Sequence, residues 1–308
     1  MKLDTRTGCS DLTSREVVTS AYRIQENAKM FDILSSRLYT DKILAPIREL
    51  LCNAYDAHVA AGIPDRPIEV TITDNFSVRD FGTGLSVEDM TELYTTYGAS
   101  NKADSNNFIG CLGLGSKSPF AYTSMFTVIS RHKGMVHKFV CSMSDHVPSI
   151  HRFPSEKLSS GESTGLEVSF ALDRDSRQFR DKLEWFALYF CAPIKLNTRS
   201  EIVVLHRQSV DFGGYGVYFN GSTGCYGNNT VQVLMGGVLY AYTLPTSHSA
   251  ASPLTYEQFD VVRNAVRSVR ADSFIIKAQM GDVDIAASRE LCEQRPRTEN
   301  FVLTKLFN

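Results

Sequence analysis

The pattern of apolar and polar positions predicts a chain of mixed helices and strands. Apolar residues recur at helical spacing over residues 47–58, whereas residues 69–74 (EVTITD) alternate as a half-buried strand does. Residues 125–130 are strand-like again, and a hairpin turn is predicted at Lys133-Gly134. The first half of the chain therefore combines one buried helix with several strands.

Helices and strands also alternate in the second half. An amphipathic helix is predicted over residues 175–192 and ends before Pro193. Strand-like runs follow (EIVVLHR, GVYFN and VQVLMGGVLYAYT), then a helix over residues 256–269 and a further run, SFIIKAQM. A chain of 308 residues can bury two cores. We therefore expect an α/β fold with two domains, residues 1–174 and residues 175–308.

One face of the helix over residues 47–58 is polar. Glu49, Asn53 and Asp56 fall at i, i+4 and i+7, so a carboxylate, an amide and a second carboxylate share that face. A buried carboxylate needs partners, because burying it unpaired is costly. A nucleotide with its Mg²⁺ and a water would supply them. A solvated edge of an ordinary amphipathic helix is the alternative.

The first of two glycine motifs follows the strand over residues 69–74. Asp80, Gly82 and Gly84 have DxGxG spacing, and the glycines let the backbone approach a flat ligand closely. The carboxylate can accept a hydrogen bond from the exocyclic amine of adenine; a tight turn after a strand is the alternative. The letters DFG do not indicate a protein kinase, because no HRD-type loop precedes them.

The second glycine motif is typical of a phosphate-binding loop. Gly110, Gly113 and Gly115 have GxxGxG spacing, and a glycine-rich loop that opens a helix presents N–H groups to phosphate. A Walker A loop is excluded, because Ser116 stands where its lysine belongs and Lys117 follows. For Lys117 the alternative is an ordinary lysine at a helix start, which is commonly solvated.

The order of these three motifs resembles that of the GHKL ATPases, which include DNA gyrase, the large ATP-driven heat-shock chaperone, sensor histidine kinases and MutL. The resemblance covers roughly residues 40–170. Two runs, FDILSSRLYTDKILAPIRELLCNAYDAH and GLGSKSPFAYTSMFTV, are similar to the rIIA-like proteins of T-even phages. The resemblance implies a GHKL (Bergerat) ATP-binding α/β sandwich, with helices on one face of a mixed sheet, followed by a smaller α/β transducer-like domain.

The resemblance also implies a role for each residue of the first two motifs. It makes Glu49 the general base for the water that attacks the γ-phosphate, and Asn53 the Mg²⁺ ligand. Asp56 matches a carboxylate near the adenine side of the pocket, and Asp80 matches the aspartate that reads adenine. The close backbone approach to the base is assigned to two glycines, Gly82 and Gly84.

The remaining nucleotide contacts implied by the resemblance lie in loops. The segment Tyr97–Asp104 matches a mobile lid over the phosphates, together with three glycines, Gly110, Gly113 and Gly115. Lys102 matches a phosphate-binding lysine in some members, with a solvated lid lysine as the alternative. Thr164 matches the threonine that closes the adenine pocket, although Ser163 replaces the usual glycine before it.

In the second half, the tetrad Ser288-Arg289-Glu290-Leu291 resembles the SRE segment of the chaperone's middle domain. That resemblance implies that Arg289 reaches across to the γ-phosphate. The alternative is an exposed arginine behind a serine that caps a helix. Histidine kinases lack such a domain, so the second half argues against that branch of the superfamily.

Composition excludes several other classes of protein. A net charge of −2 and a pI near 6.4 give no general attraction to nucleic acid or to anionic membranes. The chain contains no apolar run of membrane-spanning length, and its N-terminus is too polar for a signal peptide. Seven cysteines, scattered without CxxC spacing, favour a reducing cytoplasm over a disulfide framework or a zinc site.

These observations lead us to expect Mg²⁺-dependent hydrolysis of ATP, coupled to lid closure and to homodimerisation through the N-terminal segment. The rIIA-like resemblance implies a phage protein in the host cytoplasm or peripherally at its membrane, acting in lysis inhibition or exclusion with an unidentified protein partner. Proteins of that family are longer than this chain. Two alternatives are a nucleotide-gated protein-binding module with little hydrolysis and an ATP-driven clamp on DNA.

Overall fold

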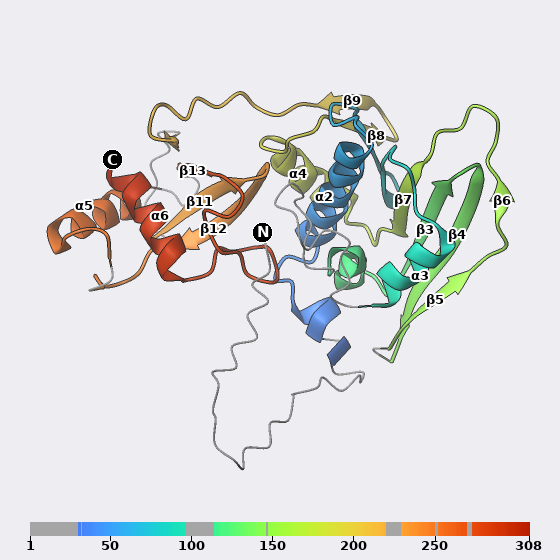
Figure 1. The fold of residues 1–308 in the computed structure, drawn as a ribbon, viewed down its shortest axis with the longest axis horizontal. Helices are drawn as coiled ribbons and strands as arrows, with labels where there is room; N and C mark the ends of the chain where they lie inside the picture. The colour runs from blue at the N-terminus through green and yellow to red at the C-terminus, as the bar shows by residue number, and fades with distance from the viewer. Residues whose placement is uncertain are drawn as a thin grey trace, which may run out of the picture.

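The computed structural model has a mixed α/β fold built around two sheets (Figure 1). The residues that it describes are 30–31, 33–96, 114–145, 147–219, 229–249, 252–269 and 273–308. Among these residues no helix is long and apolar enough to cross a membrane. The two sheets and their helices confirm the expected α/β class.

The larger sheet has nine strands in the order β5-β4-β3-β7-β2-β1-β8-β9, with β6 paired to β4. Its strands are β1 (Ile68–Ile72), β2 (Asn75–Arg79), β3 (Met125–His132), β4 (Met135–Ser144), β5 (Val147–Arg152), β6 (Glu156–Lys157), β7 (Gly165–Ala171), β8 (Ile194–Thr198) and β9 (Ile202–Leu205). All neighbours are antiparallel except β1 and β8, so the sheet is mixed. The turn predicted at Lys133-Gly134 joins β3 to β4, and both residues have positive φ.

Helices cover one face of this sheet. For that reason only alternate residues of its central strands are buried. α2 (Leu44–Ala60) and α4 (Ser176–Ala187) pack on β1, and Phe179 of α4 lies 4.9 Å from the ring of Phe76 in β2. The shorter helices are α3 (Val87–Thr95), the 3₁₀ helix η2 (Gly115–Ala121) and the π-helical turn η1 (Ile33–Arg37). α4 ends at Ala187, before the predicted limit at Pro193.

The smaller sheet has four strands in the order β10-β13-β11-β12. Its elements are β10 (Val217–Phe219), β11 (Thr230–Met235), β12 (Val238–Thr243), α5 (Tyr256–Arg267), β13 (Phe274–Ala278) and α6 (Pro296–Phe307). α5 begins with a capping box, in which Thr255 and Gln258 each accept from the other's backbone N–H. We call this sheet with α5 and α6 the second unit, and the larger sheet with its helices the first unit.

The two units divide later than the sequence pattern suggests. α4, β8 and β9 follow residue 175, yet β8 pairs with β1 over Ile68–Ile72 and so belongs to the larger sheet. By strand pairing, the change of sheet falls between Leu205 and Val217. A pattern of apolar residues identifies a strand but does not say which sheet it joins.

The turn between β11 and β12 carries the second unit onto the first. A Cβ on Gly237, which has φ of +79°, would lie 2.7 Å from the backbone nitrogen of Cys191. Only glycine permits this approach. Buried apolar residues of both sheets form one continuous core, so the position of the second unit is fixed against α2 and α4.

Candidate functional site

The polar face of α2 is enclosed. Glu49 is 2% exposed and Asp56 is fully buried, while Asn53 between them is half-buried. α2 packs against β1, β2 and η2, and its apolar residues lie in the core. A polar face inside the protein requires partners for its charges, so the solvated edge considered from the sequence is excluded.

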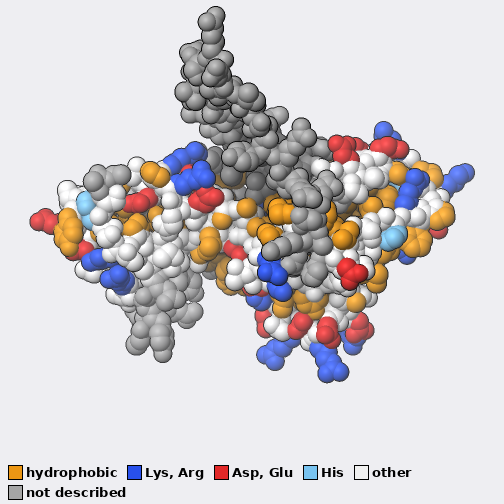
Figure 2. Space-filling model, turned by 90° about the horizontal axis from the view of Figure 1, so that it is seen from below, with side chains coloured by type: hydrophobic (Ala, Val, Ile, Leu, Met, Phe, Trp, Pro, Cys, Tyr) orange, Lys and Arg blue, Asp and Glu red, His pale blue; other side chains and the backbone are white. Residues whose placement is uncertain are grey.

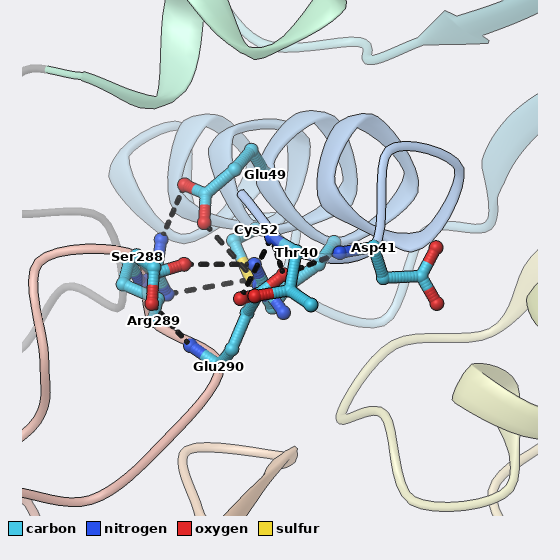
Figure 3. A network of polar contacts seen from close by, with 8 residues as sticks. Thr40, Asp41, Glu49, Cys52, Ser288, Arg289 and Glu290 are labelled. Carbon is cyan, nitrogen blue, oxygen red and sulfur yellow. Dashed lines mark hydrogen bonds and ion pairs between the residues drawn. The ribbon is translucent and has the colours of Figure 1, made fainter. Parts of the chain in front are cut away.

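Glu49 is paired with two arginines, one from each unit (Figure 3). Its Oε2 accepts from Nη1 of Arg289 at 2.7 Å, and its Oε1 accepts from Nε of Arg48 at 3.3 Å. Arg289 is 5% exposed and lies 240 residues away in the sequence. Arg289 is therefore buried against Glu49, and both residues had been singled out from the sequence. The alternative of an exposed arginine at position 289 is excluded.

Arg289 is held from several sides. Burial opposes the charge of its guanidinium, but the Glu49 carboxylate and the Tyr240 hydroxyl raise its pKa well above the ordinary value. Its Nη2 also lies 3.7 Å from Sγ of Cys52, whose pKa burial raises to about 12. The backbone of Arg289 has φ of +57°, a conformation that costs a non-glycine residue about 1–2 kcal/mol. The surrounding contacts must offset that cost.

The neighbours of Arg289 contact the first unit as well. Nη2 of Arg48 donates to the carbonyl oxygen of Ser288 at 2.9 Å. The carboxylate of Glu290 accepts from the backbone N–H groups of Thr40 and Asp41, each at 3.0 Å. Three consecutive residues of the second unit therefore contact the beginning of α2 and the segment before it. Ser288 lies in a turn and does not start a helix.

The turn after β2 places Asp80 beside the C-terminal half of α2. Asp80 is 6% exposed, and its Oδ1 accepts from the backbone nitrogens of Gly82 at 2.8 Å and Leu166 at 3.2 Å. The next residue, Phe81, donates its N–H to Nε2 of His58 at 2.9 Å. Burial lowers the pKa of His58, which favours the neutral ring that this contact requires.

Two glycines allow the chain to cross close to this turn. A Cβ on Gly84 would lie 2.4 Å from the carbonyl oxygen of Arg131, and one on Gly165 would lie 2.1 Å from that of Asp80. Both glycines have positive φ. Thr164, which precedes Gly165 and is half-buried, is therefore brought beside the Asp80 turn.

The two glycine motifs meet α2 at different levels. A Cβ on Gly115 would lie 2.5 Å from Oε2 of Glu49 and 3.5 Å from Nδ2 of Asn53, whereas one on Gly82 would lie 3.0 Å from Cβ of Ala57. At a rise of 1.5 Å per residue, positions 49 and 57 are about 12 Å apart along the helix. α2 therefore carries one glycine contact near its acid and amide and another near its far end.

Lys117 is buried, so the solvated lysine considered as an alternative from the sequence is excluded. Its side chain is 2% exposed, and Nζ donates to the carbonyl oxygens of Leu93 and Thr96, at the C-terminal end of α3. Backbone carbonyls at a helix C-terminus carry partial negative charge and attract a cation. Burial nevertheless lowers the pKa of the Lys117 ammonium to about 8.

Several predicted residues lie outside the described part of the chain. They are Lys102, Gly110, Gly113 and the rest of the expected lid, Tyr97–Asp104, together with the N-terminal segment expected to mediate dimerisation. Conversely, no sequence motif assigned a role to Arg48, Tyr240 or Glu290. Glu290 stands in the SREL tetrad, but the resemblance concerned only its arginine, and Arg48 is distinguished only by preceding Glu49.

A small cavity opens near the junction of the units, and none of the predicted site residues lines it. Its lining is formed by Leu44, Arg48, Trp185, Phe186, Tyr189, Val238 and Leu239. Among the described residues, no three His, Cys, Asp or Glu side chains are grouped as a metal site would require. The cysteines that the structure describes, Cys52, Cys141, Cys191 and Cys292, are free thiols.

No protein-family model matches this chain, and no curated protein sequence matches it significantly. The arrangement of the site itself is therefore the basis for a functional proposal.

Proposed function

We propose that this chain binds ATP with Mg²⁺ and hydrolyses it to ADP and phosphate. The observation that carries the proposal is the ion pair between Glu49 and Arg289, a carboxylate and a guanidinium brought from different units to 2.7 Å. Hydrolysis of a phosphoanhydride needs a base that orients water and a cation that stabilises the charge on the phosphate. The three spaced motifs that resemble GHKL ATPases support the same reading.

The two levels of α2 fit the two ends of a nucleotide. Asp80 is fixed by two backbone donors, so its carboxylate is held rigidly enough to read the amine of adenine. Thr164 beside that turn closes the same end, and Asp56 in α2 supports it from within the helix. Gly115 lets the backbone at the start of η2 approach Glu49 closely, so the glycine-rich loop that would bind the phosphates ends beside the proposed base.

Asn53 fits the role of Mg²⁺ ligand. Its amide lies beside Gly115, one helical turn from Glu49. A single protein oxygen, completed by phosphate oxygens and waters, is a common way to bind Mg²⁺. Bound there, the ion would neutralise negative charge on the phosphates.

The pairing of Glu49 leads us to expect slow turnover. Both carboxylate oxygens of Glu49 accept from guanidinium groups, so the base is engaged before substrate arrives. The γ-phosphate offers Arg289 a second anion, and transfer of Arg289 to it would release Oε2 of Glu49 for water. The same pairing favours the second candidate function, a nucleotide-gated protein-binding module in which Glu49 stays engaged and hydrolysis is minor.

The resemblance to rIIA-like proteins extends the proposal to a phage protein acting in lysis inhibition or exclusion, as an ATP-gated homodimer in the host cytoplasm or peripherally at its membrane. A DNA clamp is the weakest alternative. On the face seen in Figure 2, acidic and basic side chains are interspersed over the coloured surface and form no broad basic band. Binding of the phosphate backbone would need such a band.

The test is phosphate release by the parental chain and by Glu49→Gln, which keeps the shape of the side chain and one acceptor oxygen. Loss of a general base lowers the rate by about 10²–10⁴-fold, while calorimetry should show ATP affinity within a few-fold of the parental value. The matched control is Glu69→Gln, because Glu69 is bonded to Lys195 at the sheet surface. A Glu49→Gln rate equal to the parental rate would falsify the assignment, and tight ATP binding without phosphate release by the parental chain would favour the module.

A further inference from the structure

Glu290 links the second unit to the segment that starts α2. One carboxylate oxygen accepts from the backbone N–H of both Thr40 and Asp41 at 3.0 Å, and the other accepts from Thr40 at 3.1 Å. Hydrogen bonds from N–H groups to a carboxylate are charge-assisted and stronger than neutral ones. Figure 3 shows the Glu290 side chain directed at this segment, while the Asp41 carboxylate points away from it.

The segment that receives Glu290 is itself built into the first unit. Oδ1 of Asp41 accepts from the N–H groups of Ile43 at 3.1 Å and Leu44 at 2.9 Å, so it caps the start of α2. Its other oxygen pairs with Lys182 of α4. The two N–H groups that bind Glu290 therefore have a fixed relation to α2, and through α2 to Glu49.

The other side of Glu290 is fixed to the second unit. Its carbonyl oxygen accepts from the N–H of Ala241 in β12 at 3.3 Å, and the N–H of Cys292 donates to the carbonyl oxygen of Ala241 at 2.9 Å. The backbone of Glu290 is therefore hydrogen-bonded to the smaller sheet, whereas its carboxylate is hydrogen-bonded to the first unit. Arg289, the residue before it, has φ of +57° and contacts Glu49.

We propose that Glu290 is a positioning residue for the hydrolysis proposed above. By binding the amides of Thr40 and Asp41, it sets the distance from the second unit to α2 and so delivers the Arg289 guanidinium to Glu49 and to the γ-phosphate. The catalytic part of this inference rests on the proposed function. The contact between Glu290 and the two amides does not.

The experiment compares Glu290→Ala and Glu290→Gln with Glu293→Ala in the full chain. Glu293 lies three residues away and pairs only with Arg295 among the described residues, so its loss controls for changes in net charge. We expect kcat for ATP to fall about tenfold to hundredfold in Glu290→Ala, because hydrogen bonds to a charged group are lost. Glu290→Gln keeps an acceptor oxygen and should recover part of the rate, while KM for ATP and the Kd for ADP stay within about twofold.

Amide hydrogen exchange gives a readout that does not depend on hydrolysis. Thr40 and Asp41 should exchange about tenfold faster in Glu290→Ala than in the parental chain or in Glu293→Ala. Unchanged exchange at these amides would overturn the contact. Faster exchange with an unchanged kcat would overturn the positioning role. Faster exchange in a chain whose parental form releases no phosphate would refute the proposed function, and the positioning role with it, while leaving the contact in place.

Discussion

The ion pair between Glu49 and Arg289 can be tested independently of any activity. Both side chains are almost fully buried, at 2% and 6% exposure, and their closest atoms are 2.7 Å apart. We consider Arg289→Met, which removes the charge but keeps an unbranched stem, and Glu49→Gln, which removes the opposite charge. Each single substitution leaves one buried charge with fewer partners.

The expected size follows from that burial. Breaking a buried ion pair from one side lowers the free energy of unfolding by about 3–5 kcal/mol, because the remaining charge stays desolvated and uncompensated. Removing both charges abolishes the desolvation cost together with the attraction. The double variant should therefore be more stable than the sum of the single losses predicts, with a coupling energy of about 2–3 kcal/mol. Because Arg48 remains beside Glu49 in Arg289→Met, the free energy of unfolding of that variant should fall by an amount near the lower end of the 3–5 kcal/mol range, about 3 kcal/mol.

The chain offers a matched control in α4. Arg180 and Glu184 are 2.8 Å apart but 37% and 42% exposed, and Arg180 also contacts Glu201, much as Glu49 contacts two arginines. An exposed pair contributes about 0–1 kcal/mol and weakens in salt. Urea unfolding of the four variants of each cycle should be followed by circular dichroism and by the fluorescence of Trp185, the only tryptophan, at low and at high ionic strength.

A coupling energy below about 0.5 kcal/mol for Glu49 and Arg289, or one that disappears in salt as the control does, would refute the reasoning. Such a result would mean that the two side chains are solvated and that the second unit does not hold Arg289 against α2. The mechanism proposed for hydrolysis would then lose its cation.

Two further predictions concern Asp80, beside the C-terminal half of α2, and the buried lysine, Lys117. Asp80→Asn keeps an oxygen for the backbone donors but replaces the second oxygen with an NH₂ donor. Calorimetry should therefore show ATP binding weakened by about tenfold or more, at an unchanged free energy of unfolding. Equal binding of ATP and GTP by the parental chain would contradict an adenine-reading role. Because the pKa of Lys117 is lowered to about 8 from 10.5, the unfolded chain binds more protons between those values, and stability rises with pH across that window. Relative to Lys117→Met, the parental free energy of unfolding should gain about 3 kcal/mol from pH 8 to pH 10.5, and a constant difference would show that the ammonium is not desolvated.

The sequence alone determined the local elements and the polar face of α2. A period near 3.6 and strict alternation are properties of the backbone geometry, so the helix over residues 47–58 and the turn at Lys133-Gly134 appear where they were predicted. The strand predicted over residues 69–74 is β1 (Ile68–Ile72), and Thr73 and Asp74 lie in the turn to β2. Glu49, Asn53 and Asp56 share a face for the same reason. The nucleotide roles attached to them, and to Asp80, remain predictions.

Only the tertiary structure decided which side chains meet across long distances in the sequence. Arg289 and Glu49 are 240 residues apart, and Glu290 and Thr40 are 250 apart; neither separation has a periodic signature. Sheet membership is equally non-local, which is why β8 and β9 joined the first sheet beyond the expected boundary. The burial of Lys117 was decided in the same way, because the carbonyls that accept from it end a different helix. Local pattern fixes which face of an element is apolar, whereas its partners depend on how the whole chain packs.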